Sequence, residues 1–183
     1  EEFPALPELD EQNAVTIPSE LFKTIIQTTS FAISGDELKP ALTGVLFQFK
    51  DGGLTTVATD GHRLARYHIK EFESTGFSGD IIIPRKFLSL SKNLLGKKET
   101  VEMQIGKNHI TVTFGDDKVH SRIIDERYPD YESVIPTNND KSLTINTQEM
   151  ISAVRRVSIF SNRTTQQIAI KMDKDILEIT TED

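Results

Sequence analysis

The sequence contains no cysteine, and this absence excludes several classes of function at once. Without thiols the chain has no cysteine nucleophile, no disulfide framework and no cysteine-based zinc site, which favours a reducing, cytoplasmic location. Long apolar runs are missing too, because runs such as Ile81-Ile82-Ile83 are far shorter than a membrane span. The first residues lack the basic and then apolar order of a signal peptide. We therefore expect a soluble protein with no membrane partner.

Positive charge is the minority charge in this sequence. There are 21 Lys and Arg against 28 Asp and Glu, which gives a net charge of −7. This balance argues against nucleic-acid binding over the whole surface, because phosphate contact needs clustered cations. Two segments nevertheless concentrate basic residues: Arg85, Lys86, Lys92, Lys97 and Lys98 in the first, and Arg155, Arg156 and Arg163 in the second. Most such runs are solvated helix faces, but on repeated helices they could form one surface for a phosphate backbone.

What the sequence does contain is one order of elements that occurs three times. A short strand leads into an amphipathic helix, and a hairpin of β-branched and aromatic residues follows. Prolines and polar residues start the helices, and Gly35 and Gly96 end the first two. The strand and helix of each copy span 15–33, 83–95 and 143–160, and the hairpins span 45–59, 101–114 and 168–180. The pattern predicts an internal repeat.

The repeat predicts the fold class and the domains. One helix and several antiparallel strands per copy indicate an α+β protein with the helices on one side of the sheets. The linker 136–140 is rich in Pro, Asn and Asp and is the best domain boundary. We expect two copies in a domain of residues 13–140, and half of a second domain in residues 141–183.

An enzymatic alternative rests on Asp60, His62 and His68. These residues could form an acid–base site, since histidine titrates near neutrality. A turn after a strand explains the same residues more simply, because Asp-Gly is ordinary turn chemistry. The two histidines have no further ligands at zinc-like spacing, and the glycines lack the spacing of a phosphate-binding loop. We predict no metal and no cofactor.

Four stretches of this sequence resemble the bacterial DNA polymerase III β-subunit family, the replicative sliding clamps. They are Thr59-Asp-Gly-His-Arg-Leu-Ala65, Ile83-Pro-Arg-Lys86, Arg127-Tyr-Pro-Asp-Tyr131 and Val134-Ile-Pro136. The resemblance implies the DNA-clamp fold, in which repeated units place helices along a central DNA channel and sheets on the outer wall. It also implies that residues 1–12 are an interdomain linker, 13–140 the middle domain and 141–183 the first half of the third domain.

The resemblance implies a role for the turn around Gly61 as well. In the family this turn is one wall of a hydrophobic groove that binds short linear motifs, and we expect the rest of the groove to come from residues beyond this chain. The expected partners are the polymerase III α subunit, the clamp loader and other proteins with a clamp-binding motif. The groove residues implied here are Leu42, Thr59, Gly61, His62, Arg63, Leu64, Pro129, Ser133 and Val134.

The resemblance also implies contacts to DNA and contacts between subunits, at other positions of the chain. Arg85 and Lys86 match a basic pair of the family, whereas Lys23, Arg155 and Arg156 are inferred to face DNA from their helix positions. Ile159 and Phe160 match an apolar pair at the subunit interface, although both could equally be core residues.

The sequence therefore predicts a fragment of a non-catalytic sliding clamp. The full-length protein is expected to encircle double-stranded DNA as a homodimer, independently of its sequence. Two alternatives remain at this point: a monomeric peptide-binding module of the same fold that does not encircle DNA, and an enzyme that uses Asp60 and His62.

Overall fold

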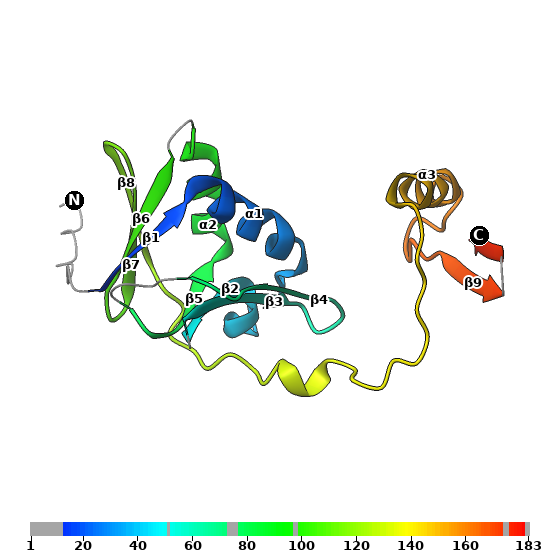
Figure 1. Cartoon of the computed structure of the whole chain (residues 1–183), viewed down its shortest axis with the longest axis horizontal. Coiled ribbons are helices and arrows are strands. Elements are labelled where there is room, and N and C mark those ends of the chain that lie inside the picture. The colour runs from blue at the N-terminus through cyan, green and yellow to red at the C-terminus, as the bar shows by residue number, and fades with distance from the viewer. Residues whose placement is uncertain (1–12, 51, 73–76, 97–98, 174–175, 182–183) are drawn as a thin grey trace. The chain divides into compact units, whose positions relative to one another are not determined.

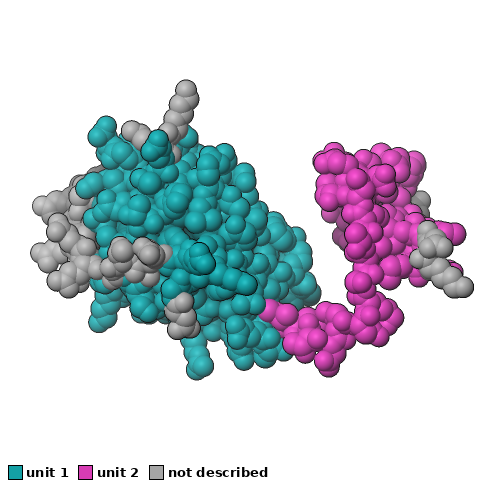
Figure 2. All heavy atoms as spheres, in the orientation of Figure 1, with its two compact units in different colours: residues 1–134 teal, residues 135–183 magenta. Residues whose placement is uncertain are grey.

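A computed structural model describes most of the chain in two compact units. The described residues are 13–50, 52–72, 77–96, 99–173 and 176–181 (Figure 1). Unit 1 comprises residues 1–134 and unit 2 comprises residues 135–183 (Figure 2). The predicted linker 1–12 lies outside the described residues, as do Lys97 and Lys98.

Unit 1 contains two copies of the predicted strand, helix and hairpin. The first copy consists of β1 (Ala14–Pro18), α1 (Ser19–Thr29), β2 (Gly44–Lys50), β3 (Gly53–Thr59) and β4 (Leu64–Ile69). The second consists of β5 (Gly79–Pro84), α2 (Arg85–Leu94), β6 (Thr100–Ile105), β7 (His109–Phe114) and β8 (Asp117–Arg122). The first helix is shorter than predicted, because the chain tightens into a 3₁₀ turn at Ser30–Ala32 before Gly35 is reached.

The two copies are interlocked, because each gives its first strand to the sheet of the other. One sheet has the order β4-β3-β2-β5 and the other β1-β6-β7-β8. All pairings are antiparallel, with Ile17 opposite Val101 and Ile83 opposite Val45. Neither four-stranded sheet is therefore complete with the strands of one copy alone.

The core of unit 1 lies between the helices and the inner faces of both sheets (Figure 1). Phe22 and Ile25 of α1 are fully buried together with Phe47 of β2 and Ile83 of β5. Helical spacing places Phe22 and Ile25 on one face of α1, and alternation places Phe47 on one face of its strand. The predicted α+β class, with antiparallel sheets and helices on one side of them, is confirmed.

An irregular segment, residues 123–131, lies across the outer face of the sheet that contains β2. We call it the strap. The Ile124 amide donates to the carbonyl of Ile82 at 3.0 Å, and the Tyr131 hydroxyl donates to Gln48 Oε1 at 2.7 Å. Ile82 is 3% exposed although it points away from the inner core, so the strap gives this sheet a second buried face.

Unit 2 contains one helix and one hairpin. It consists of α3 (Thr147–Ser158), β9 (Ala169–Asp173) and β10 (Ile176–Thr180), with β9 and β10 antiparallel. The strand predicted before α3 is wrong, because residues 141–146 adopt no regular structure. The physical reason lies in unit 1, where β1 and β5 are strands only through pairing with the other copy. The described residues of unit 2 hold no second copy with which 141–146 could pair.

Candidate functional site

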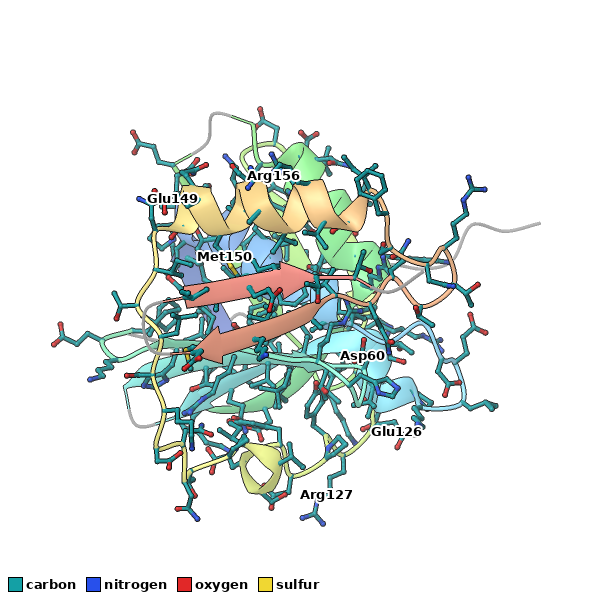
Figure 3. The ribbon with its side chains drawn as sticks, turned by 90° about the vertical axis from the view of Figure 1, so that its right-hand side faces the viewer. Asp60, Glu126, Arg127, Glu149, Met150 and Arg156 are labelled. Carbon is teal, nitrogen blue, oxygen red and sulfur yellow. The ribbon has the colours of Figure 1, made fainter. Side chains whose placement is uncertain are left out.

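The turn between β3 and β4 is held by one carboxylate, that of Asp60. Its Oδ1 accepts the backbone amides of His62 at 2.9 Å and Arg63 at 2.8 Å. Its Oδ2 accepts Nε and a terminal nitrogen of the Arg63 guanidinium at 3.1 and 2.8 Å. Figure 3 labels Asp60 in this turn. A short segment that is exposed at His62 and Arg63 is thus fixed by four hydrogen bonds to a single side chain.

These bonds also decide the protonation of Asp60. The backbone amide of Arg63, then its guanidinium and then the amide of His62 hold the pKa of the Asp60 carboxyl well below its usual range. A carboxylate with so low a pKa is a poor proton acceptor at neutral pH. His68 lies elsewhere, on β4, where its Nδ1 is 2.8 Å from Thr55 Oγ1. The three residues of the acid–base alternative therefore do not come together.

Gly61 and Thr59 complete the turn. Gly61 has a φ of +90°, a conformation that residues with a side chain resist. The Thr59 hydroxyl accepts the amide of Gly61 at 3.1 Å and donates to the carbonyl of Arg63 at 2.7 Å. Leu64, half-buried, follows directly and pairs with Thr59 across the strands. The turn is therefore rigid, with an apolar side chain at its base and two cationic or polar side chains at its exposed end.

The other predicted groove residues come from separate segments. Leu42 lies in a short 3₁₀ helix (Pro40–Thr43) and is only 8% exposed, so it offers little surface. Val134 ends unit 1 and is 67% exposed, and its neighbour Ser133 donates its hydroxyl to the carbonyl of Asp130 at 2.8 Å. Of the predicted set, the structure gathers Thr59 to Leu64 in one turn.

The strap brings Pro129 close to this turn through its neighbour Tyr128. Burial raises the pKa of the Tyr128 hydroxyl to about 12, against a smaller opposing effect of the Thr59 backbone. Beneath the strap lies a hollow of about 820 Å³, lined by Pro129, Tyr128 and Tyr131 among others. The sequence reasoning missed this packing of Tyr128 and Tyr131, although the apolar and aromatic residues of 123–131 were a visible signal.

The predicted DNA-facing residues differ in their local electrostatics. Arg85 and Lys86 are exposed in the first turn of α2, where the positive end of the helix dipole disfavours cations. Arg155 and Arg156, exposed in the last turn of α3, are favoured by the dipole; Figure 3 labels Arg156. Helix stability can therefore account for the second pair but not for the first.

The remaining predicted residues are on the surface. Lys23 of α1 is partly exposed and lies 3.6 Å from the carboxylate of Glu20. Ile159 and Phe160 follow α3 and are 76% and 73% exposed, so they are not core residues of unit 2 as described. Among the described residues, no group of three or more His, Asp or Glu side chains could hold a metal ion. No described helix has the length and apolar character that spanning a membrane requires.

Two family models match the chain. The model described as DNA polymerase III beta subunit, central domain, matches residues 16–130, and the model of its C-terminal domain matches residues 132–183. Two curated relatives are beta sliding clamps. That of Bacillus subtilis is 35% identical over 88% of this chain and 43% of its own length. That of Escherichia coli K12 is 33% identical over 98% of this chain and 49% of its own length.

Solved structures agree with these matches. A sliding clamp (DNA polymerase III subunit beta) from Pseudomonas aeruginosa bound to griselimycin has a TM-score of 0.88 at 30% identity, and the match covers 98% of this chain and 49% of that one. The C. crescentus beta sliding clamp has a TM-score of 0.91 at 28% identity, with 100% and 50% covered. The chain thus spans about half the length of its relatives, and the predicted clamp fold is confirmed.

Proposed function

The chain belongs to the DNA polymerase III β-subunit family, the bacterial sliding clamps, and from this premise we propose that it is part of a non-catalytic processivity factor. The full-length protein would encircle double-stranded DNA as a homodimer in the cytoplasm. It would tether the polymerase III α subunit, the clamp loader and other proteins that carry a clamp-binding motif. Residues 13–140 would be its middle domain, and residues 141–183 the first half of its third.

The observation that carries the proposal is the turn locked by Asp60. A binding surface that is fixed before its ligand arrives loses little conformational entropy on binding. Leu64 and Val134 offer apolar contact, and His62 and Arg63 offer hydrogen-bond donors at the rim. This combination suits a short peptide with apolar anchors. Leu42, Pro129 and Ser133 complete the proposed groove wall.

The proposed DNA contacts rest on the charge of the helices. Arg85 and Lys86 stand at a helix start that does not favour them, and α1 with Lys23 packs beside α2. Phosphate contact by such residues is independent of base sequence and weak enough to permit sliding. Arg155 and Arg156 would contribute in the same way. Ile159 and Phe160, both exposed and apolar, would contact the other subunit of the ring.

Titration of the 183-residue chain with a fluorescently labelled clamp-motif peptide tests the groove. We expect Leu64→Glu to weaken binding at least about tenfold, or roughly 1.4 kcal/mol, because a carboxylate would stand where an apolar anchor docks. Lys118→Glu is the matched control. It adds the same side chain on β8, at the corresponding hairpin of the second copy, and should leave the peptide affinity unchanged. Equal affinity of Leu64→Glu and the unaltered chain would refute the groove.

A second measurement separates the clamp from a monomeric peptide-binding module. A chain extended to the full length of its relatives is loaded onto circular and linear DNA of equal size. Retention on closed circles, with loss from linear ends, is the result expected of a ring. Equal loss from both forms would favour the monomeric module, while leaving the peptide groove in place.

A further inference from the structure

The strap of unit 1 has backbone hydrogen bonds at its first residues only, such as the one from the Ile124 amide to the Ile82 carbonyl at 3.0 Å. Among the described residues, no backbone–backbone hydrogen bond involves residues 125–130. Pro129 has no amide hydrogen to donate. Side chains must therefore hold the part of the strap that carries Pro129 to the turn.

Tyr131 is the side chain that anchors the far end of the strap. It is 7% exposed, and its hydroxyl donates to Gln48 Oε1 at 2.7 Å. The other acceptor near this hydroxyl, Glu132 Oε1, is 3.5 Å away. A phenol has one proton, so the shorter bond takes it. Tyr131 is thus tied to the outer face of β2 by one hydrogen bond to Gln48.

Asp80 decides which end of the Gln48 amide faces Tyr131. It stands opposite Gln48 in the pairing of β2 with β5, and its Oδ2 accepts Gln48 Nε2 at 3.0 Å. Lys50 Nζ lies 3.0 Å from the other carboxylate oxygen of Asp80. A carboxylate can only accept, so the amide turns its nitrogen to Asp80 and its oxygen to Tyr131. The residue at position 131 must then be a donor.

The second tyrosine of the strap, Tyr128, lies against the turn. Its hydroxyl is buried, and it lies close enough to the Thr59 backbone for that backbone to oppose the effect of burial on the Tyr128 pKa. Pro129 follows directly, and Val134 comes three residues after Tyr131. The anchor at Tyr131 therefore stands between two residues of the proposed groove.

We propose that Tyr131, oriented through Gln48 and Asp80, is a positioning residue of the peptide groove. The inference rests on the proposed function and deepens it. Tyr131 touches no peptide, but it holds Pro129 and Val134 beside the turn before a peptide arrives. A strap without this bond is displaced for part of the time. Because only the held strap binds, the apparent affinity falls with the fraction that is held.

Stopped-flow titration of the 183-residue chain with a labelled clamp-motif peptide tests the proposal. Tyr131→Phe removes the hydroxyl and keeps the ring. We expect a loss of affinity of about two- to tenfold, which is the range for one net hydrogen bond. The loss should lie in slower association, since the strap is already held in the complex. Leu64→Glu removes a contact to the peptide instead and should speed dissociation.

Two further variants control for the loss of a hydrogen bond as such. The buried Thr111 hydroxyl is 2.7 Å from His120 Nδ1 in the other sheet of unit 1. Thr111→Val should therefore leave both rate constants unchanged. Gln48→Leu breaks the Tyr131 bond from its other side. The double variant Tyr131→Phe/Gln48→Leu should bind about as tightly as the weaker single variant, because both changes remove one bond.

A second measurement reads the strap without any peptide. The nuclear Overhauser effect between the Tyr128 ring and the Thr59 amide should be visible in the unaltered chain. It should weaken in Tyr131→Phe, because the strap then leaves the turn, and stay unchanged in Thr111→Val. An undiminished signal in Tyr131→Phe would overturn the proposal.

The peptide titration could overturn it in three other ways. Tyr131→Phe could bind as tightly as the unaltered chain, its loss could lie wholly in faster dissociation, or Thr111→Val could lose as much affinity. Failure of the proposed function has a different signature, because the unaltered chain and Leu64→Glu would then both fail to bind peptide. The Tyr128 signal would still report whether Tyr131 holds the strap.

Discussion

Units 1 and 2 are built from the same repeat but differ in how much of it is buried. Unit 1 pairs two copies and fully buries large side chains from both, including Phe22, Phe47 and Leu88. The described residues of unit 2 hold one copy, and no residue of α3 or β9 is fully buried. The helix and hairpin of unit 2 thus adopt their secondary structure without closing a core. The stable unit of this architecture is the pair of copies, as in other repeat proteins whose units bury their apolar faces on neighbours.

The two units also differ in what stabilises the first turns of their helices. α1 and α2 follow Pro18 and Pro84, and neither has a side-chain cap. α3 has one, because Asn146 Oδ1 accepts the amides of Gln148 at 2.9 Å and Glu149 at 3.1 Å. Tertiary packing stabilises the first two helices, whereas the least buried helix depends more on its own sequence.

The largest expected effect is on the core that only unit 1 has. We expect Phe47→Ala to lower the free energy of unfolding of unit 1 by about 3–5 kcal/mol, since it leaves a cavity among fully buried neighbours. Denaturant unfolding, followed by a probe within unit 1, measures it. The matched variant Ile170→Ala occupies the same hairpin position in unit 2 and should not move this transition. A comparable shift from both variants would mean that the two units unfold as one.

An intermediate effect is expected at the helix starts. Asn146→Ala removes two capping hydrogen bonds and should destabilise α3 by about 1 kcal/mol, seen as faster amide exchange in its first turn. Ser19→Ala is the contrasting variant at the start of α1. The Ser19 hydroxyl is buried without a hydrogen-bond partner among the described residues, so its removal should cost nothing or stabilise slightly. Equal losses of helix stability in Asn146→Ala and Ser19→Ala would contradict the difference between helices held by packing and a helix held by its own cap.

The smallest expected effect is the pH dependence of the turn at Asp60, which we compare with a turn in unit 2. Asp60 stabilises its turn as an anion, and its pKa is lower in the folded protein than in the unfolded chain. Its contribution is therefore complete above the unfolded pKa and is lost as the pH falls below about 4. In unit 2, Asn162 Oδ1 accepts the amides of Thr164 and Thr165 at 2.9 and 3.2 Å but has no charge to lose.

NMR amide shifts measure this contrast directly. Those of His62 and Arg63 should change in acid, while those of Thr164 and Thr165 stay constant. The variant Asp60→Asn should make the first turn equally insensitive to pH. A pH-dependent shift that persists in Asp60→Asn would show that another group titrates.

Local patterns predicted most elements of this chain. Proline followed by a polar residue marked the starts of α1 and α2, and alternation around glycines marked the hairpins. The exchange of β1 and β5 was not predictable in this way, because a strand such as 15–17 carries no local sign of its partner near residue 101. For the same reason, the strand predicted at 143–145 is absent where no partner is available.

The candidate site was predicted as a set of residues but not as a geometry. The sequence around Gly61 indicated a turn, while the pairing of Asp60 with Arg63 depended on side-chain directions that spacing does not give. The strap was missed because its apolar residues have no period of 2 or 3.6. Its burial follows instead from the apolar outer face of β2 and β5, which could be recognised only once those strands were paired.

The exchange of first strands also determines how unit 1 bears mechanical load. The chain enters at β1 in one sheet, and the strap leaves across the face of the other. The ladders of β1 with β6 and of β5 with β2 each join strands of different copies. Neither copy can therefore be pulled out of unit 1 without shearing a ladder between strands of different copies.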